Sequence, residues 1–270
     1  MMKIEDIFQK WTLDVVDEQA GLERWNNKAD HFEKLKLPTA SSSLAMRLIE
    51  ENCMVAPGNR VLDVGCGGGQ FALALEQMGA KAIGTDFSEK MIESCRRNCA
   101  ALGMQTEFHI CNWHHADLDE LGWRGKFDLV LANMTPAVAS AETFWKLSEA
   151  SKKWCLMVKP TRRINSVLDN LFKLVGARKE SEKLDETIAF AFNILWLKGY
   201  SPKLEYEFQT WEAEQPLEKS VAEYTNRIRS VSSLTEQQEQ EIKDYLMKTA
   251  VDGIIRETTT TLITAMYWQV

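Results

Sequence analysis

The chain of 270 residues lacks an apolar run long enough to cross a membrane, and its first residues lack a basic stretch followed by an apolar one. It also lacks internal repeats and low-complexity segments. Its six cysteines include no Cys-x-x-Cys pair, so we expect mostly reduced, buried thiols. These absences argue against a membrane protein, a repeat array and a disulfide scaffold, and they predict a cytoplasmic location.

A basic surface is missing as well. The net charge is −7, and no Lys/Arg stripe stands out along the chain. A protein that holds a phosphate backbone needs a positively charged surface, so we do not expect a nucleic-acid substrate. The hydrophobic fraction of 45% and the charged fraction of 26% are ordinary for a globular protein of one large or two small domains.

The most informative feature is a glycine-rich turn after an apolar, β-prone stretch. Residues 61–69 read V-L-D-V-G-C-G-G-G, and an apolar helical stretch follows them. A second β-prone stretch, residues 82–86, ends in Asp86. Strand, glycine turn, helix and a second strand with a terminal acid together describe half of a nucleotide-binding α/β unit.

The glycine spacing separates two kinds of nucleotide site. A dinucleotide fingerprint, Gly-x-Gly-x-x-Gly, would require glycine at position 70, where the chain has Gln70. A nicotinamide dehydrogenase is therefore disfavoured. Asp63, two residues before Gly65, and the further glycines at 67 and 69 instead resemble motif I of the class I S-adenosylmethionine-dependent methyltransferases.

This resemblance implies how the cofactor would be held. The turn formed by Gly65, Cys66 and Gly67, with Asp63 before it, would approach the amino acid and ribose parts of S-adenosylmethionine. Asp86 would accept hydrogen bonds from the ribose hydroxyls, because an ionised carboxylate is an acceptor with two oxygens. The product would be S-adenosylhomocysteine.

Further positions match the class by their place after strands. Asn112, just past the third strand, would accept from the adenine amine, with Trp113 and Phe87 as apolar contacts of the ring. Asn133 ends the fourth strand at the motif IV position, which faces the sulfonium and the incoming nucleophile. Near the amino terminus, an aromatic and a basic residue resemble a segment that folds over the cofactor. These two residues are Trp25 and Lys28.

Histidines are the candidates for a general base, because the imidazole pKa lies near neutrality. We consider His114, His115 and His31 in this role. Cys111 with His114 and His115 could also suggest zinc, but no fourth ligand has a recognisable spacing, so we predict no metal.

The pattern of elements predicts an α/β fold: a seven-stranded Rossmann-like methyltransferase sheet with helices on both faces. The expected strands are 60–64, 82–86, 106–111, 127–132, 154–158, 204–211 and 258–268, the last returning antiparallel between its neighbours. The expected helices include 44–54, 70–78, 89–102, 164–176, 187–197 and two within 216–250. We expect an N-terminal helical cap over 1–56 and a methyltransferase domain over 57–270, with helical insertions at about 160–185 and 212–257.

The sequence thus predicts an enzyme that transfers a methyl group from S-adenosylmethionine to a small-molecule acceptor. Phe190-Ala191-Phe192-Asn193 and Gly199-Tyr200 resemble a microbial subset of small-molecule or unassigned methyltransferases. A non-catalytic S-adenosylmethionine-binding module, and a methyltransferase acting on a protein or RNA, stay open as alternatives. Neither the acceptor nor the oligomeric state follows from the sequence.

Overall fold

The computed structural model describes residues 3–13, 22, 25–26, 36–177, 180–229 and 232–270. Its contacts divide the chain into two compact units. The first unit comprises 1–159, 187–205 and 264–270, and the second comprises 160–186 and 206–263. In the part of the chain that is described, no helix is long and apolar enough to span a membrane.

A seven-stranded sheet organises the molecule, with the order β3-β2-β1-β4-β5-β7-β6. Its strands are β1 (Arg60–Val64), β2 (Lys81–Asp86), β3 (Glu107–Ile110), β4 (Phe127–Asn133), β5 (Ser151–Asn165), β6 (Lys203–Pro216) and β7 (Ile254–Gln269). Strands β1 to β5 are parallel where their pairing is defined. Strand β7 is antiparallel to β5, because Val270 N donates to Lys153 O and Ser166 N donates to Thr258 O. The predicted fold class is confirmed.

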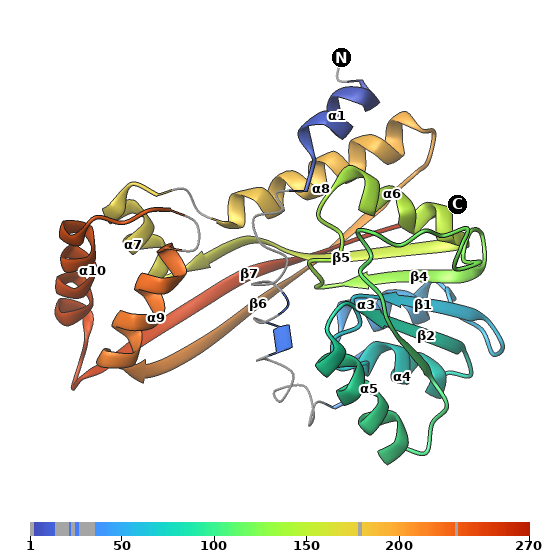
Figure 1. The fold of residues 1–270 in the computed structure, drawn as a ribbon, viewed down its shortest axis with the longest axis horizontal. Helices are drawn as coiled ribbons and strands as arrows, with labels where there is room; N and C mark the ends of the chain where they lie inside the picture. The colour runs from blue at the N-terminus through green and yellow to red at the C-terminus, as the bar shows by residue number, and fades with distance from the viewer. Residues whose placement is uncertain (1–2, 14–21, 23–24, 27–35, 178–179, 230–231) are drawn as a thin grey trace. The chain divides into compact units, whose positions relative to one another are not determined.

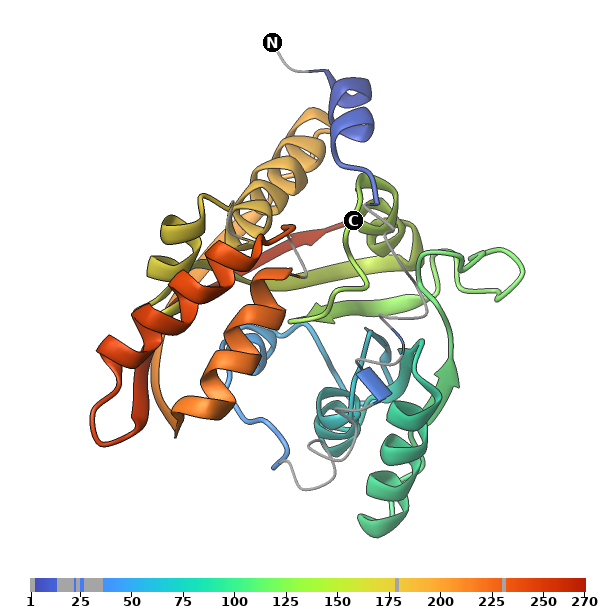
Figure 2. The ribbon, with the colours of Figure 1, turned by 60° about the vertical axis from the view of Figure 1, so that its left-hand side comes forward.

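Helices cover both faces of the sheet in the first unit. Helices α4 (Gln70–Gln77) and α5 (Glu89–Ala101) lie on one face of β1 to β3, and α6 (Ala141–Ala150) lies on the other face (Figure 1; Figure 2). Helix α1 (Ile4–Lys10) joins the α6 side, where Ala141 N donates to Trp11 O over 2.9 Å. Helix α3 (Leu44–Glu51) begins at Ser43, whose side chain accepts from Met46 N.

The central strands explain why the core forms here. Strands β1 and β4 are buried on both faces, so they read as mainly apolar runs, interrupted by Asp63 and Asp128, instead of alternating ones. The core on the α6 side joins these strands to α1, α6, β7 and the second half of α8 (Glu180–Leu197). Its buried members include Ile7, Trp11, Leu62, Val130, Phe144, Ile194 and Trp268.

The second unit has a core of its own. Helices α7 (Leu168–Val175), α9 (Leu217–Arg229) and α10 (Glu236–Thr249) contribute its apolar residues. Asn165 stabilises the start of α7, since its Oδ1 accepts from Val167 N and Leu168 N at 3.0 and 2.8 Å. Helix α10 begins with a capping box of Thr235 and Gln238.

Three strands are longer than the sequence suggests. The sequence predicts that the fifth strand ends at Val158, yet β5 continues through Pro160 to Asn165. The parallel partner β4 ends where Asn133 pairs with Val158, so β5 has no ladder on that side at Pro160. The missing proline N–H therefore breaks no bond there. Strands β6 and β7 also extend beyond their predicted bounds, and α8 begins at 180 instead of 187.

Candidate functional site

The glycine turn joins the end of β1 to α4. Gly65, Gly67 and Gly69 all have positive φ, at 66°, 54° and 81°. A Cβ atom added at Gly65 would lie 1.9 Å from Thr135 Oγ1, so the turn closely approaches the loop after β4. Glycine at 65 is therefore required both by the backbone conformation and by the space available.

Asp86 brings the end of β2 against this turn. Its Oδ2 accepts from Gly67 N at 3.1 Å, and its Oδ1 accepts from Ser88 N at 2.9 Å. The carboxyl group is buried, and burial raises its pKa above the ordinary value despite these two donors. Two of the sequence-predicted cofactor residues, Gly67 and Asp86, are thus in direct contact.

Asp63 is a second buried acid beside them. It is 2% exposed, and its Oδ2 has no hydrogen-bond partner among the described residues. Burial raises the pKa of Asp63 to about 7, the Ala72 backbone amide lowers it, and the charge of Asp86 raises it further. A buried acceptor without a donor is costly in a folded protein unless a ligand supplies one.

Cys66 lies in the turn with its thiol turned toward the protein. Its Sγ is 3.9 Å from Cys95 Sγ, and Cys95 Sγ donates to Gly67 O at 2.9 Å. Burial raises the pKa of Cys66 well above its ordinary value. The thiol is therefore protonated, and the backbone of Cys66 is the part that remains for a ligand.

The segment after β3 is held by a lysine from α6. Lys146 Nζ donates to the carbonyl oxygens of Trp113, His114 and Ala116 at 3.2, 3.0 and 2.9 Å. Asn112 Oδ1 accepts from His114 N at 3.1 Å, which closes a local turn. The loop that carries four predicted site residues, Asn112, Trp113, His114 and His115, is therefore held by these bonds.

Within that loop the side chains differ in exposure. Trp113 is buried, and its Nε1 donates to Thr143 O at 2.9 Å within the core. His114 is half-buried and His115 is exposed. Among the described residues, no group of three or more His, Cys, Asp or Glu side chains is placed to hold a metal ion.

The end of β4 has an unusual backbone. Asn133 is half-buried at the strand end, and Met134 follows with φ of 52° and donates from its N to Val158 O at 2.9 Å. Lys159 Nζ then donates to Thr135 O and Val138 O at 2.6 and 2.8 Å. The loop at the predicted motif IV position is thus tied to β5, a contact that the sequence did not suggest.

The amino-terminal segment reaches the same region at Asn26. Asn26 Oδ1 accepts from the Ser88 hydroxyl at 2.6 Å, beside Asp86 and the half-buried Phe87. Trp25 is half-buried next to Asn26. Lys28 and His31 lie outside the described residues.

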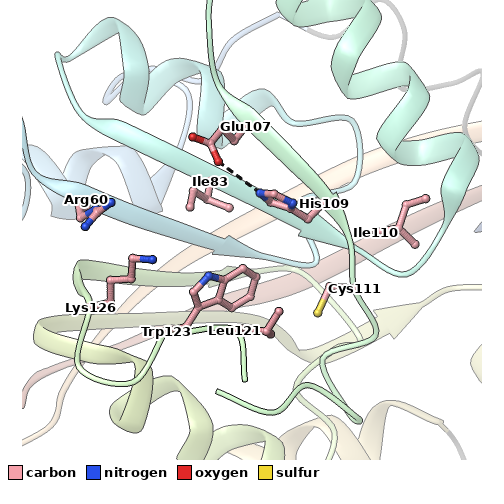
Figure 3. Close-up of a pocket in the computed structure, with 9 residues that line it drawn as sticks. All are labelled: Arg60, Ile83, Glu107, His109, Ile110, Cys111, Leu121, Trp123 and Lys126. Atoms are coloured by element: carbon pink, nitrogen blue, oxygen red, sulfur yellow. Dashed lines mark ion pairs between the residues drawn. The ribbon is translucent and has the colours of Figure 1, made fainter. Parts of the chain in front are cut away.

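A separate hollow of about 370 Å³ is lined by the start of β1, by β2 and β3, and by the chain between β3 and β4 (Figure 3). Its lining includes Arg60, Ile83, His109 and Trp123. Neither the glycine turn nor Asp86 contributes to it. The hollow in Figure 3 is therefore distinct from the cluster built by the sequence motifs.

Comparisons with known proteins agree with this geometry. Residues 56–189 match the family model described as a methyltransferase domain. Over 89 residues the chain is 36% identical to the 23S rRNA (uracil(1939)-C(5))-methyltransferase RlmD of Shewanella sp. strain ANA-3, covering 33% of this chain and 20% of that protein. Over 100 residues it is 33% identical to the ribosomal protein L11 methyltransferase of Symbiobacterium thermophilum, covering 37% and 30%. The chain thus spans less than a third of either curated relative.

A solved structure from Bacillus halodurans C-125, described as a candidate methyltransferase, has a similar fold. The TM-score is 0.50 at 17% identity, with 83% of this chain and 97% of that chain covered. The sheet order and glycine turn define an α/β protein of the Rossmann-like methyltransferase class. Residues 56–189 belong to the methyltransferase-domain family, in the class whose cofactor is S-adenosylmethionine.

Proposed function

We propose that this protein transfers a methyl group from S-adenosylmethionine to a small-molecule acceptor. The observation that carries the proposal is the buried Oδ2 of Asp63, which has no hydrogen-bond partner among the residues that the structure describes, at a glycine turn that Asp86 braces. A cationic cofactor would satisfy such an acid, and turn glycines without side chains leave backbone groups accessible to it. The residues therefore fit the cofactor of the class.

When bound, S-adenosylmethionine supplies a methyl group activated by a sulfonium. The chain's own task is to bind, orient and exclude water. In the proposal, Asp86 accepts from the ribose hydroxyls in addition to its backbone donors. Gly65 and Cys66 present main-chain atoms to the amino acid part.

The remaining contacts follow the sequence resemblance. Asn112 would accept from the adenine amine, with Phe87 and Trp113 beside the ring. Because the Trp113 indole is buried against the core, its backbone is the nearer part to a ligand. Asn133 would face the methyl group, and Trp25 would cover the cofactor.

Two predicted roles belong to side chains near the acceptor or the cofactor carboxylate. His114 and His115 follow Asn112, so either would be near the site if a base is needed. His31 is a third candidate for the base, and Lys28 would pair with the cofactor carboxylate.

A small molecule is the acceptor that composition favours. The net charge of −7 provides no positive field that would attract the phosphate backbone of RNA. The RNA-methylating relative shares only 89 aligned residues with this chain, within a domain that many acceptors can use. A cytoplasmic location is part of the same proposal.

Calorimetry with S-adenosylmethionine, S-adenosylhomocysteine and NAD tests the cofactor. Binding of the two sulfur compounds and not of NAD is expected. Response to NAD alone would contradict the proposal.

Labelled S-adenosylmethionine then tests the acceptor against three fractions of a microbial extract: small molecules, RNA and protein. Label is expected in the small-molecule fraction. Label in RNA or protein would identify the other acceptor classes, and cofactor binding without any transfer would indicate a non-catalytic module. An Asp86→Ala variant controls for methylation by contaminating enzymes, since its transfer should fall with its cofactor affinity.

A further inference from the structure

Lys159 is a buried cation in the first unit, at the point where β5 passes the loop after β4. The residue is 3% exposed. Its ammonium donates to two main-chain carbonyls of that loop, Thr135 O at 2.6 Å and Val138 O at 2.8 Å. An ammonium has three N–H donors, so one remains after these two bonds.

No carboxylate of the described residues pairs with this charge. Among the described residues, the two carbonyls are the hydrogen-bond partners of Lys159, and it forms no ion pair. Burial alone lowers the pKa of Lys159 to about 8. The group is still mainly protonated at neutral pH, so a positive charge persists in a dry environment, where its field is weakly screened.

The loop that Lys159 holds also contacts the glycine turn. Thr135 Oγ1 lies so close to Gly65 that a Cβ there would be 1.9 Å away. Thr135 Oγ1 also accepts from Ala137 N at 3.2 Å, which fixes the loop from within. The charge of Lys159 is therefore one loop away from the turn that the proposed function assigns to the cofactor.

We propose that Lys159 sets the charge preference of the methyl-transfer site, disfavouring a sulfonium relative to a thioether and favouring an acceptor that arrives as an anion. The inference rests on the proposed function, because the end of β4 is where that function places the sulfonium. Lys159 acts through the field of its ammonium and through the loop, so it is a specificity-determining residue and not a catalytic one.

The charge balance of the reaction explains both preferences. A lone pair of the acceptor forms the bond to the methyl carbon while the carbon–sulfur bond breaks and its electron pair stays on sulfur. The positive charge on sulfur disappears, and an anionic acceptor becomes neutral without losing a proton. A fixed cation disfavours the charged sulfonium and favours the anionic acceptor, and both effects diminish as the two charges neutralise each other. Lys159 therefore acts on which cofactor form and which acceptor bind, and an acceptor that arrives as an anion needs no general base.

The test compares dissociation constants of S-adenosylmethionine and S-adenosylhomocysteine, measured by calorimetry at neutral pH. Lys159→Gln removes the charge and keeps two N–H donors for the loop carbonyls. We expect the preference for S-adenosylhomocysteine over S-adenosylmethionine to fall by about fivefold, a size typical of one charge interaction at moderate screening. Lys159→Arg, which keeps the charge, should retain most of the preference.

Lys146→Gln is the matched control. Lys146 also donates to loop carbonyls, but on the loop after β3. Its loss is expected to change both affinities together and leave their ratio unchanged. If Lys159→Gln does not fold, Lys159→Met carries the same expectation for the ratio.

The outcomes separate the two proposals. If the wild-type protein binds neither compound, the proposed function itself is wrong. If it binds both and a folded, uncharged Lys159 variant keeps the wild-type ratio, the charge role is wrong and the function stands. An equal change of the ratio in Lys146→Gln would also refute a specific role for Lys159.

Discussion

Asp63→Asn is the perturbation with the best-defined consequences. The substitution keeps the shape of the side chain, and the amide oxygen can still accept from the Ala72 backbone N–H. It removes the possibility of a buried negative charge beside Asp86. In the protein without cofactor we therefore expect the Asn variant to be more stable than the wild type at neutral pH.

The magnitude follows from the pKa of Asp63. Burial raises it from the ordinary value of 3.8 to about 7. Between these values the folded protein binds a proton that the unfolded chain has lost, so the wild-type free energy of unfolding falls as the pH rises. At 1.36 kcal/mol per pKa unit the full loss is about 4 kcal/mol above pH 7. The Asn variant lacks this pH-dependent loss, so its free energy of unfolding should equal that of the wild type near pH 4.

Urea denaturation at pH 4.5, 6 and 7.5 measures the difference. The gap between the variants should open with rising pH. Asp128→Asn is a control that should lower the free energy of unfolding instead of raising it, because Asp128 accepts from Arg60 N at 2.9 Å and pairs with Lys152 at 3.2 Å. Parallel stability curves for the wild type and Asp63→Asn would refute the reasoning.

Cofactor binding should respond in the opposite direction. An ionised Asp63 can pair with a cation, whereas an amide cannot, so Asp63→Asn should weaken binding of S-adenosylmethionine by about 1.5–3 kcal/mol, the range for hydrogen bonds to charged groups. Wild-type affinity should also rise with pH as Asp63 ionises near pH 7. A variant that gains stability and keeps full affinity would show that Asp63 does not meet the cofactor.

Three further predictions concern the same region. Asp86→Ala should weaken cofactor affinity by roughly 1.5–3 kcal/mol in calorimetry, and Asn112→Ala by less, because a neutral hydrogen bond is weaker; equal losses would contradict the assignment. Gly65→Ala should abolish cofactor binding or folding, since its Cβ would overlap Thr135 Oγ1, and a folded variant with normal affinity would contradict this. The unfolding free energy of the wild type should rise between about pH 8 and 10.5 as the folded-state Lys159 loses its proton before the unfolded chain does, and Lys159→Gln should not show this rise in urea denaturation.

Elements specified by local signals were predicted well. Ser88 caps α5, and its hydroxyl accepts from Met91 N at 3.2 Å, as an N-cap residue should. The glycine turn and the two strands around it also followed from residues that are adjacent in sequence. The strand extensions did not, because their pairing depends on distant segments.

The electrostatics of the site could not be read from the sequence. Lys159 was visible only as a residue before a proline, whereas its partners are 24 and 21 residues away. Asn26 meets Ser88 across 62 positions. Trp113 was recognised as an aromatic residue after a strand, but its bond to Thr143 O depends on the packing of α6. A buried lysine beside a loop of two carbonyl acceptors has no local signature, so only tertiary structure could reveal it.

Three buried ionisable groups surround one end of the sheet in the first unit. Asp63 and Asp86 stand on β1 and β2, and Lys159 stands on β5 with a loop between it and the glycine turn. Each is poorly solvated, so each lowers the stability of the empty fold. In the proposed function, Asp63 meets the amino acid part of the cofactor and Asp86 meets its ribose, while Lys159 lies one loop away from the side where the methyl group would leave. The arrangement therefore matches a ligand that brings positive charge to one side and loses positive charge at the other, which is the charge change of methyl transfer from a sulfonium.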